Sequence, residues 1–192
     1  MKALLVLGDG MADEPLAELG GRTPLEAART PNFDRIAREG ACGLLRTIPP
    51  GCEAGSDIAN LSILGYDPGK YYTGRGPLEA ASMGIALGEG DIAYRCNLVT
   101  VADGVMEDFS AGHIPSRDGG SLIRAVAAGL KGVSLHPGIS YRNLLVVHGG
   151  EGAETTPPHD IVGERIESYL PRGPDAPRLL RTMEWSREIL RG

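Results

Sequence analysis

The sequence predicts an α/β fold made of two consecutive parts. Residues 2–7 form a short apolar run that stops at Gly8-Asp9-Gly10, as a buried parallel strand does where it ends beside a ligand site. After residue 90 the pattern changes to a hairpin, a helix and further strands, which is typical of an α+β module. The 28 glycines and 14 prolines are too many for a helical bundle and suit a fold with many turns. We therefore predict part of a parallel sheet over residues 1–90 and an α+β module over residues 91–192.

The first part is expected to hold two strands and three helices. After the strand at 2–7, a helix is predicted over 30–40, because Thr30 is a good N-cap, Pro31 suits the first turn and Gly40 stops the helix. A short strand is predicted at 42–47, followed by a Pro-Pro-Gly turn. Two short helices are predicted at 56–64 and 77–83.

The second part is expected to contain strands joined by a hairpin and followed by helices. A strand is predicted at 92–101, and Asp103-Gly104 is a strong hairpin signal that leads to a returning strand at 105–109. An amphipathic helix is predicted over 121–130, because Leu122, Val126 and Leu130 share one stripe. Two further strands and a last helix are predicted at 133–136, 141–148 and 179–190.

Composition excludes several classes of function. The formal net charge of −6 argues against nonspecific nucleic-acid binding. No run of 18 apolar residues could span a membrane, and the apolar run before Asp9 is too short for a signal peptide, so we expect a cytoplasmic protein without a membrane partner. The three cysteines lack CxxC spacing and are expected to be reduced thiols.

Asp9 and Ser56 are the residues that most suggest chemistry. Asp9 follows the predicted strand and precedes a glycine, so its carboxylate suits a metal. Ser56 lies between a Gly-led turn and an apolar stretch, where free N–H groups and the helix dipole favour a phosphate or an alkoxide. Together they suggest a metal-activated serine that accepts a phosphoryl group. Taken singly, each residue could equally be a helix cap.

A series of motifs in this order resembles a known family: Asp9-Gly10-Met11-Ala12-Asp13, Thr23-Pro24-Leu25-Glu26-Ala27-Ala28, Thr30-Pro31-Asn32-Phe33-Asp34, Gly55-Ser56-Asp57, Leu64-Gly65-Tyr66-Asp67-Pro68, Tyr71-Tyr72-Thr73-Gly74-Arg75-Gly76-Pro77, Arg95-Cys96-Asn97 and Thr155-Thr156-Pro157-Pro158-His159-Asp160. The chain is similar, from residue 1 to about residue 190, to the archaeal-type cofactor-independent phosphoglycerate mutases of the alkaline phosphatase superfamily. This resemblance implies interconversion of 2- and 3-phosphoglycerate in glycolysis and gluconeogenesis, through a phosphoserine at Ser56. It also implies two divalent metals, Mn or Mg with Zn as an alternative, with Asp9 and Ser56 among their ligands.

The resemblance also predicts how the two parts are related. In that family a module such as residues 91–192 is inserted into an alkaline-phosphatase-like domain, which a long second half then completes. We therefore expect residues 1–90 to be the N-terminal part of the metal-binding domain and the chain to be an N-terminal portion of a larger enzyme. Two metals need more donors than Asp9 and Ser56 supply, so we expect the 192-residue chain alone to be inactive. Uncovered apolar edges would favour a homo-oligomer.

Five further residues are expected to bind a small phosphorylated acid. Phosphoglycerate carries a phosphate and a carboxylate, and the arginine fork suits both groups. Arg95 and Arg142 lie in apolar strand stretches, whereas Arg75 could equally be a solvated surface charge. His113 and His159 could carry a proton or contact substrate, although the family usually has Arg at the His113 position. The alternatives are a non-catalytic folded fragment and a relative acting on another phosphorylated or phosphonate substrate.

Overall fold

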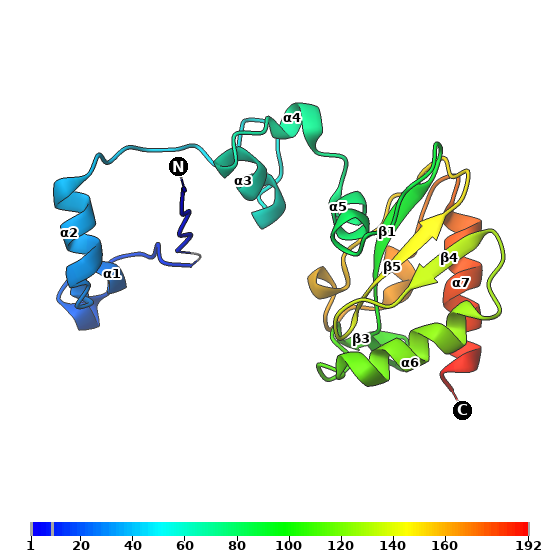
Figure 1. Ribbon diagram of the computed structural model, residues 1–192. Helices are drawn as coiled ribbons and strands as arrows, with labels where there is room; N and C mark the ends of the chain where they lie inside the picture. Colours follow the sequence, from blue (N-terminus) through cyan, green and yellow to red (C-terminus); the bar gives the residue numbers. More distant parts are fainter. Residues whose placement is uncertain (1, 9, 192) are drawn as a thin grey trace.

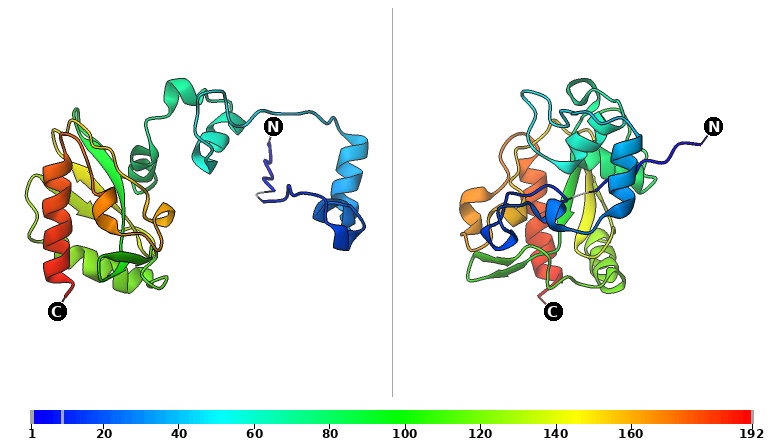
Figure 2. Two further views of the ribbon diagram at one scale, coloured as in Figure 1. Left: turned by 180° about the vertical axis from the view of Figure 1, so that it is seen from behind. Right: turned by 90° about the vertical axis from the view of Figure 1, so that its left-hand side faces the viewer.

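The computed structural model describes residues 2–8 and 10–191. Up to about residue 74 the chain consists of short helices and extended segments that lie outside the sheet unit, whereas the remainder packs around a sheet (Figures 1 and 2). Helices and strands together bear out the α/β class. Within the described ranges, none of the helices is both long and apolar enough to cross a bilayer.

Side-chain caps begin two of the short helices of the first part. Their bounds are η1 Ala17–Leu19, α1 Pro24–Ala27, α2 Pro31–Glu39, α3 Ser56–Ile63, α4 Pro68–Tyr71 and α5 Arg75–Ser82. At α1 the Thr23 side chain and Glu26 form a reciprocal capping box. The Asp67 carboxylate caps α4 by accepting from the Gly69 N–H at 2.9 Å. The helices predicted at 30–40, 56–64 and 77–83 are thus confirmed, with shifted ends.

The strands predicted at 2–7 and 42–47 were wrong. Neither segment is assigned to a strand, and neither has a β-partner among the described residues. A single strand leaves its backbone N–H and C=O groups unpaired, so an apolar sequence alone does not make one. The apolar side chains of these segments are consequently exposed, with Leu4 at 88% and Leu44 at 107% of the reference area.

The C-terminal unit is built on a three-stranded antiparallel sheet in the order β1-β5-β4. Its strands are β1 Ile92–Asn97, β4 Val133–His136 and β5 Arg142–Val147, and β2 Thr100–Ala102 and β3 Val105–Asp108 form a separate hairpin. The hairpin signal is confirmed, because Asp103 and Gly104 both have positive φ, at 49° and 79°. The strand predicted over 92–101 divides at Leu98, whose N–H donates to the Tyr141 carbonyl at 2.9 Å.

Helices cover the sheet unit from different sides. On one face α5 packs through Ala80 against Ala93, Leu144 and Val146. On the opposite face α7 (Ala176–Ile189) packs Leu179 against Leu145 and Val147. The predicted domain boundary near residue 90 stays a prediction, but α5 precedes it and belongs to the packing of this sheet. Helix α6 (Ser116–Ala127) lies beside β4, and Trp185 of α7 donates a hydrogen bond to the Val126 carbonyl at 2.9 Å.

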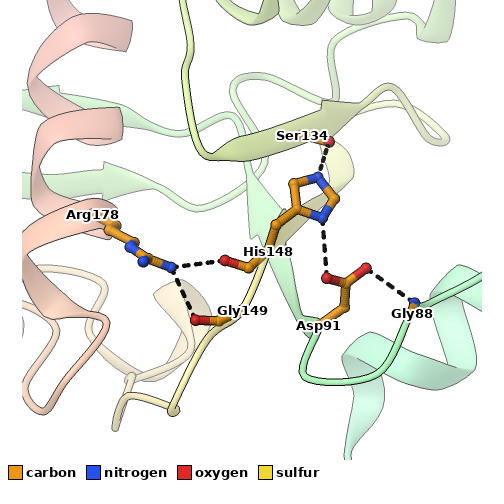
Figure 3. Close-up of polar contacts among 6 residues, drawn as sticks. All are labelled: Gly88, Asp91, Ser134, His148, Gly149 and Arg178. Carbon is orange, nitrogen blue, oxygen red and sulfur yellow. Dashed lines mark hydrogen bonds and ion pairs between the residues drawn. The ribbon is translucent and has the colours of Figure 1, made fainter.

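A polar row joins the three strands at one end of the sheet (Figure 3). His148, after β5, has its Nδ1 3.1 Å from Asp91 Oδ1 and its Nε2 2.5 Å from Ser134 Oγ. Asp91 also accepts from the Gly88 N–H at 3.0 Å, and Arg178 of α7 donates to the His148 carbonyl at 2.9 Å. The row therefore connects β1, β5 and β4 to the loop after α5 and to α7, so His148 has a structural role.

Candidate functional site

Two of the predicted arginines lie side by side at one end of the sheet. Asn97 pairs with Arg142 across β1 and β5, and Arg95 pairs with Leu144. The Arg95 Nε is buried and has no hydrogen-bond partner among the described residues. Burial lowers the pKa of Arg95, and the positive charges of Arg142 and Arg75 lower it further. A buried guanidinium N–H that has no acceptor, with further positive charges nearby, favours binding of an anionic ligand.

An aromatic cluster links the two predicted histidines to Arg142. The rings of Phe109 and Tyr141 meet edge to face with their centroids 5.8 Å apart. His159 stacks edgewise on Phe109 and His113 on Tyr141, each at 6.1 Å. The Arg142 guanidinium lies 5.3 Å from the centre of the Tyr141 ring. The structure thus brings three of the five predicted substrate residues, His113, His159 and Arg142, around two aromatic rings that the sequence alone did not indicate.

The loop that carries His113 has an unusual backbone, in which Ala111, Gly112 and His113 all have positive φ. Positive φ is unfavourable for Ala and His and persists only where the surroundings hold it. Asp108 provides that support, because its carboxylate accepts from the Ser110 N–H at 2.7 Å, the Ser110 hydroxyl at 2.6 Å and the Gly112 N–H at 2.5 Å. These hydrogen bonds lower the pKa of Asp108. An Asp two residues before a Ser is typical of a turn that the Asp side chain closes, so Asp108-Phe109-Ser110 could have indicated this turn from the sequence.

Ser56 is the first residue of α3, and Gly55 before it offers no side chain to cap the helix. The next residue, Asp57, is the centre of a polar group. Its Oδ2 accepts a hydrogen bond from the Tyr72 hydroxyl and lies 3.2 Å from Arg75 Nε. Burial alone would raise the pKa of Asp57, but the hydrogen bond from Tyr72 and the charge of Arg75 outweigh burial and lower it. Arg75 is therefore paired within the protein, and its predicted role in substrate binding stays a prediction.

The predicted metal site is only partly covered by the structure. Asp9 lies outside the described residues. Over 2–8 and 10–191, no three His, Cys, Asp or Glu side chains gather closely enough to hold a metal ion. A hollow of about 400 Å³ beside Thr155 and Thr156 is lined by none of the predicted site residues. Cys96 packs under α7, where burial raises the pKa of its thiol to about 12, so it is inert.

Comparison with known proteins identifies the family. The family model described as 2,3-bisphosphoglycerate-independent phosphoglycerate mutase matches residues 37–192. The chain belongs to this family. The mutase of Methanothrix thermoacetophila is 56% identical over 190 residues, which cover 99% of this chain and 48% of that protein. The mutase of Methanosarcina mazei is 52% identical over 194 residues, which cover 99% of this chain and 49% of that protein.

Solved structures agree with the family assignment. The cofactor-independent phosphoglycerate mutase of Thermoplasma acidophilum matches with a TM-score of 0.53 at 33% identity, over 94% of this chain and 50% of that one. A Pyrococcus horikoshii protein matches with a TM-score of 0.66 at 28% identity, over 96% of this chain and 43% of that one. The chain spans about half the length of the curated relatives it matches.

Proposed function

We propose that the natural gene product carrying these residues interconverts 2- and 3-phosphoglycerate through a phosphoserine at Ser56. The observation that carries the proposal, within a chain of this family, is the buried Arg95 Nε, which has no partner among the described residues. Arg142 lies on the neighbouring strand, against the aromatic cluster that His113 and His159 also contact. A phosphate and a carboxylate on one small molecule suit two adjacent arginines. The histidines are suited to hold or move a proton near neutral pH.

The reaction divides into two transfers at the serine hydroxyl. Ser56 Oγ forms a bond to phosphorus while the bond from phosphorus to the glycerate oxygen breaks, and the serine proton ends on that oxygen. The phosphoryl group then moves to the neighbouring glycerate hydroxyl, which restores the serine. The N-terminus of α3 favours the anionic group at Ser56, because the first backbone N–H groups of a helix lack partners.

The family resemblance implies two divalent metals, Mn or Mg with Zn as an alternative, for which we propose Asp9 and Ser56 as two of the ligands. A metal bound there would lower the pKa of the serine hydroxyl. The described side chains do not by themselves form a site for two metals, so the two phosphoryl transfers are assigned to protein side chains alone. We also propose that the protein works in the cytoplasm.

The test is the activity of the natural gene product with Ser56→Ala, with Ser121→Ala on α6 as the matched control. We expect Ser56→Ala to lose both turnover and the phosphoserine that mass spectrometry detects in the wild type, while circular dichroism is unchanged. The control should keep both, since Ser121 is exposed and lies on another helix. Retained interconversion in Ser56→Ala would refute the proposal. Turnover of another phosphorylated or phosphonate acid instead of phosphoglycerate would favour the alternative substrate.

A further inference from the structure

A polar group of three side chains lies next to Ser56 in the sequence and around the first turn of α3. Asp57 Oδ2 accepts from the Tyr72 hydroxyl and pairs with Arg75 Nε, 15 and 18 residues further along the chain. We propose that Asp57, Tyr72 and Arg75 form a clamp, and that they are positioning residues that hold Ser56 toward the arginines of the sheet. The inference rests on the proposed function. It adds Asp57 and Tyr72, which the sequence did not assign, and gives Arg75 a positioning role in place of substrate binding.

Tyr72 is the first partner of Asp57, and it lies in a turn that several hydrogen bonds hold in place. Tyr72 follows α4, and its N–H donates to the Pro68 carbonyl at 2.9 Å. Asp67 caps the start of the same helix, and Pro68 is buried. The N–H of Tyr66 donates to the Leu61 carbonyl at 2.9 Å, so α4 follows α3 through a closed turn. Tyr72 therefore meets Asp57 from a segment already tied to the end of α3.

Arg75 is the second partner of Asp57, and its helix, α5, packs against the sheet. Arg75 is the first residue of α5, and the next residue, Gly76, lies against β1 so closely that a Cβ atom there would be 1.9 Å from the Ala93 carbonyl oxygen. Ala93 is two residues before Arg95 on the same strand. A hydrogen bond at Asp57 is thus linked, through Arg75 and α5, to the strand that carries the unpartnered Arg95.

Gly55 makes room for the clamp. A Cβ atom at Gly55 would lie 2.4 Å from Asp57 Oδ1 and 3.1 Å from Arg75 Nη2. The absence of a side chain at the residue before Ser56 therefore leaves room for the carboxylate and the guanidinium to meet in this position. While Asp57 keeps both partners, the first turn of α3 is held in place relative to α5. If these contacts break, α3 retains its contacts with α4 but loses its ion pair with Arg75 of α5.

Hydrogen exchange on the 192-residue chain tests the clamp without any assay of activity. Tyr72→Phe combined with Arg75→Gln should reduce protection of the α3 amides by about tenfold, while the amides of β5 stay protected, because local opening follows local contacts. Tyr71→Phe is the matched control, since Tyr71 is exposed and does not contact Asp57. Unchanged protection of α3 in the double variant would overturn the clamp.

Kinetics of the natural gene product test its positioning role. Tyr72→Phe and Arg75→Gln should each lower kcat by about tenfold or more, with KM within about twofold, because a displaced nucleophile slows the transfer and leaves binding intact. Arg75→Lys should recover part of the loss, and the double variant should be no worse than Asp57→Asn, since both partners act through one carboxylate. A higher KM at unchanged kcat for Arg75→Gln would show that Arg75 binds substrate and overturn the proposal. Mutase activity retained in Ser56→Ala would instead count against the proposed function.

Discussion

Asp175 joins three parts of the C-terminal unit through one carboxylate. The side chain is 3% exposed and accepts hydrogen bonds from the Tyr94 hydroxyl at 3.0 Å and the Gly152 N–H at 2.9 Å. It also accepts from the Glu151 N–H at 3.3 Å, and Asp175 itself is the N-cap residue of α7. Burial alone would raise the pKa of Asp175, but the donors outweigh burial and hold it below the ordinary value of 3.8. The same contact raises the pKa of Tyr94 to about 12, with burial as the larger cause.

We expect Asp175→Asn to lower the free energy of unfolding at pH 7 by about 2 kcal/mol, because hydrogen bonds to a charged acceptor are lost. The folded-state pKa is depressed, so this contribution is present above the ordinary carboxylate pKa and disappears as the pH falls through the lower folded-state pKa. Denaturant unfolding at pH 7 and near pH 3 measures the difference, with the exposed Glu151→Gln as control. An equal gap between wild type and variant at both pH values would contradict this account.

Helix α5 shows how an element can belong to a unit that lies after it in the sequence. The helix begins at Arg75 rather than at residue 77, and Gly76 brings it into backbone contact with β1. Its Ala80 is 1% exposed and covers Ala93, Leu144 and Val146, with Met83, Ile85 and Leu87 around them. A division of the chain at residue 90 would remove this cover from one face of the sheet.

Two segments expressed alone test the role of α5. Residues 74–191 should unfold in one cooperative thermal transition, because the core on both faces of the sheet is complete. Residues 91–191 should melt at least about 10 °C lower or self-associate, since a loss of about 2 kcal/mol shifts the melting temperature by that amount in a unit of this size. Calorimetry and sedimentation measure both quantities. Equal melting temperatures would show that α5 adds nothing to the sheet unit.

At the scale of the whole molecule, packing is concentrated after residue 74. Figure 1 and the left view of Figure 2 show α1 and α2 lying away from the sheet unit. The segments at 2–7 and 42–47 expose Leu4, Val6, Leu44 and Leu45. Apolar segments whose backbone N–H and C=O groups lack hydrogen-bond partners favour pairing with another chain or segment. This is the reason why we expect a homo-oligomer.

Limited trypsin digestion should reveal this difference in packing. The first cut is expected after Arg46, which lies in an irregular, exposed stretch between α2 and α3. Arg124 of α6 and Arg142 of β5 should resist cleavage, because their backbones are held in the packed unit. Mass spectrometry of early fragments identifies the sites. Simultaneous cleavage at Arg46 and Arg142 would contradict the predicted order.

The sequence by itself determined most of the local structure and the family. Caps, prolines and glycines act over a few residues, so three helices of the first part and the hairpin at Asp103-Gly104 could be predicted, with errors at the ends. The motifs along the chain were sufficient to indicate the mutase family, because they are long and occur in order. Arg142, His113 and His159 were predicted as site residues, but not that they meet at one aromatic cluster.

Only the tertiary structure decided what depends on distant partners. Residues 2–7 and 42–47 have apolar, strand-like sequences, yet a strand requires hydrogen bonds from another segment, and none is present among the described residues. The aromatic cluster at Phe109 and Tyr141 joins residues more than thirty positions apart. The Asp57 clamp depends on Tyr72 and Arg75 folding back on α3. No local pattern encodes such contacts, because their free energy arises from groups that meet only in the folded chain.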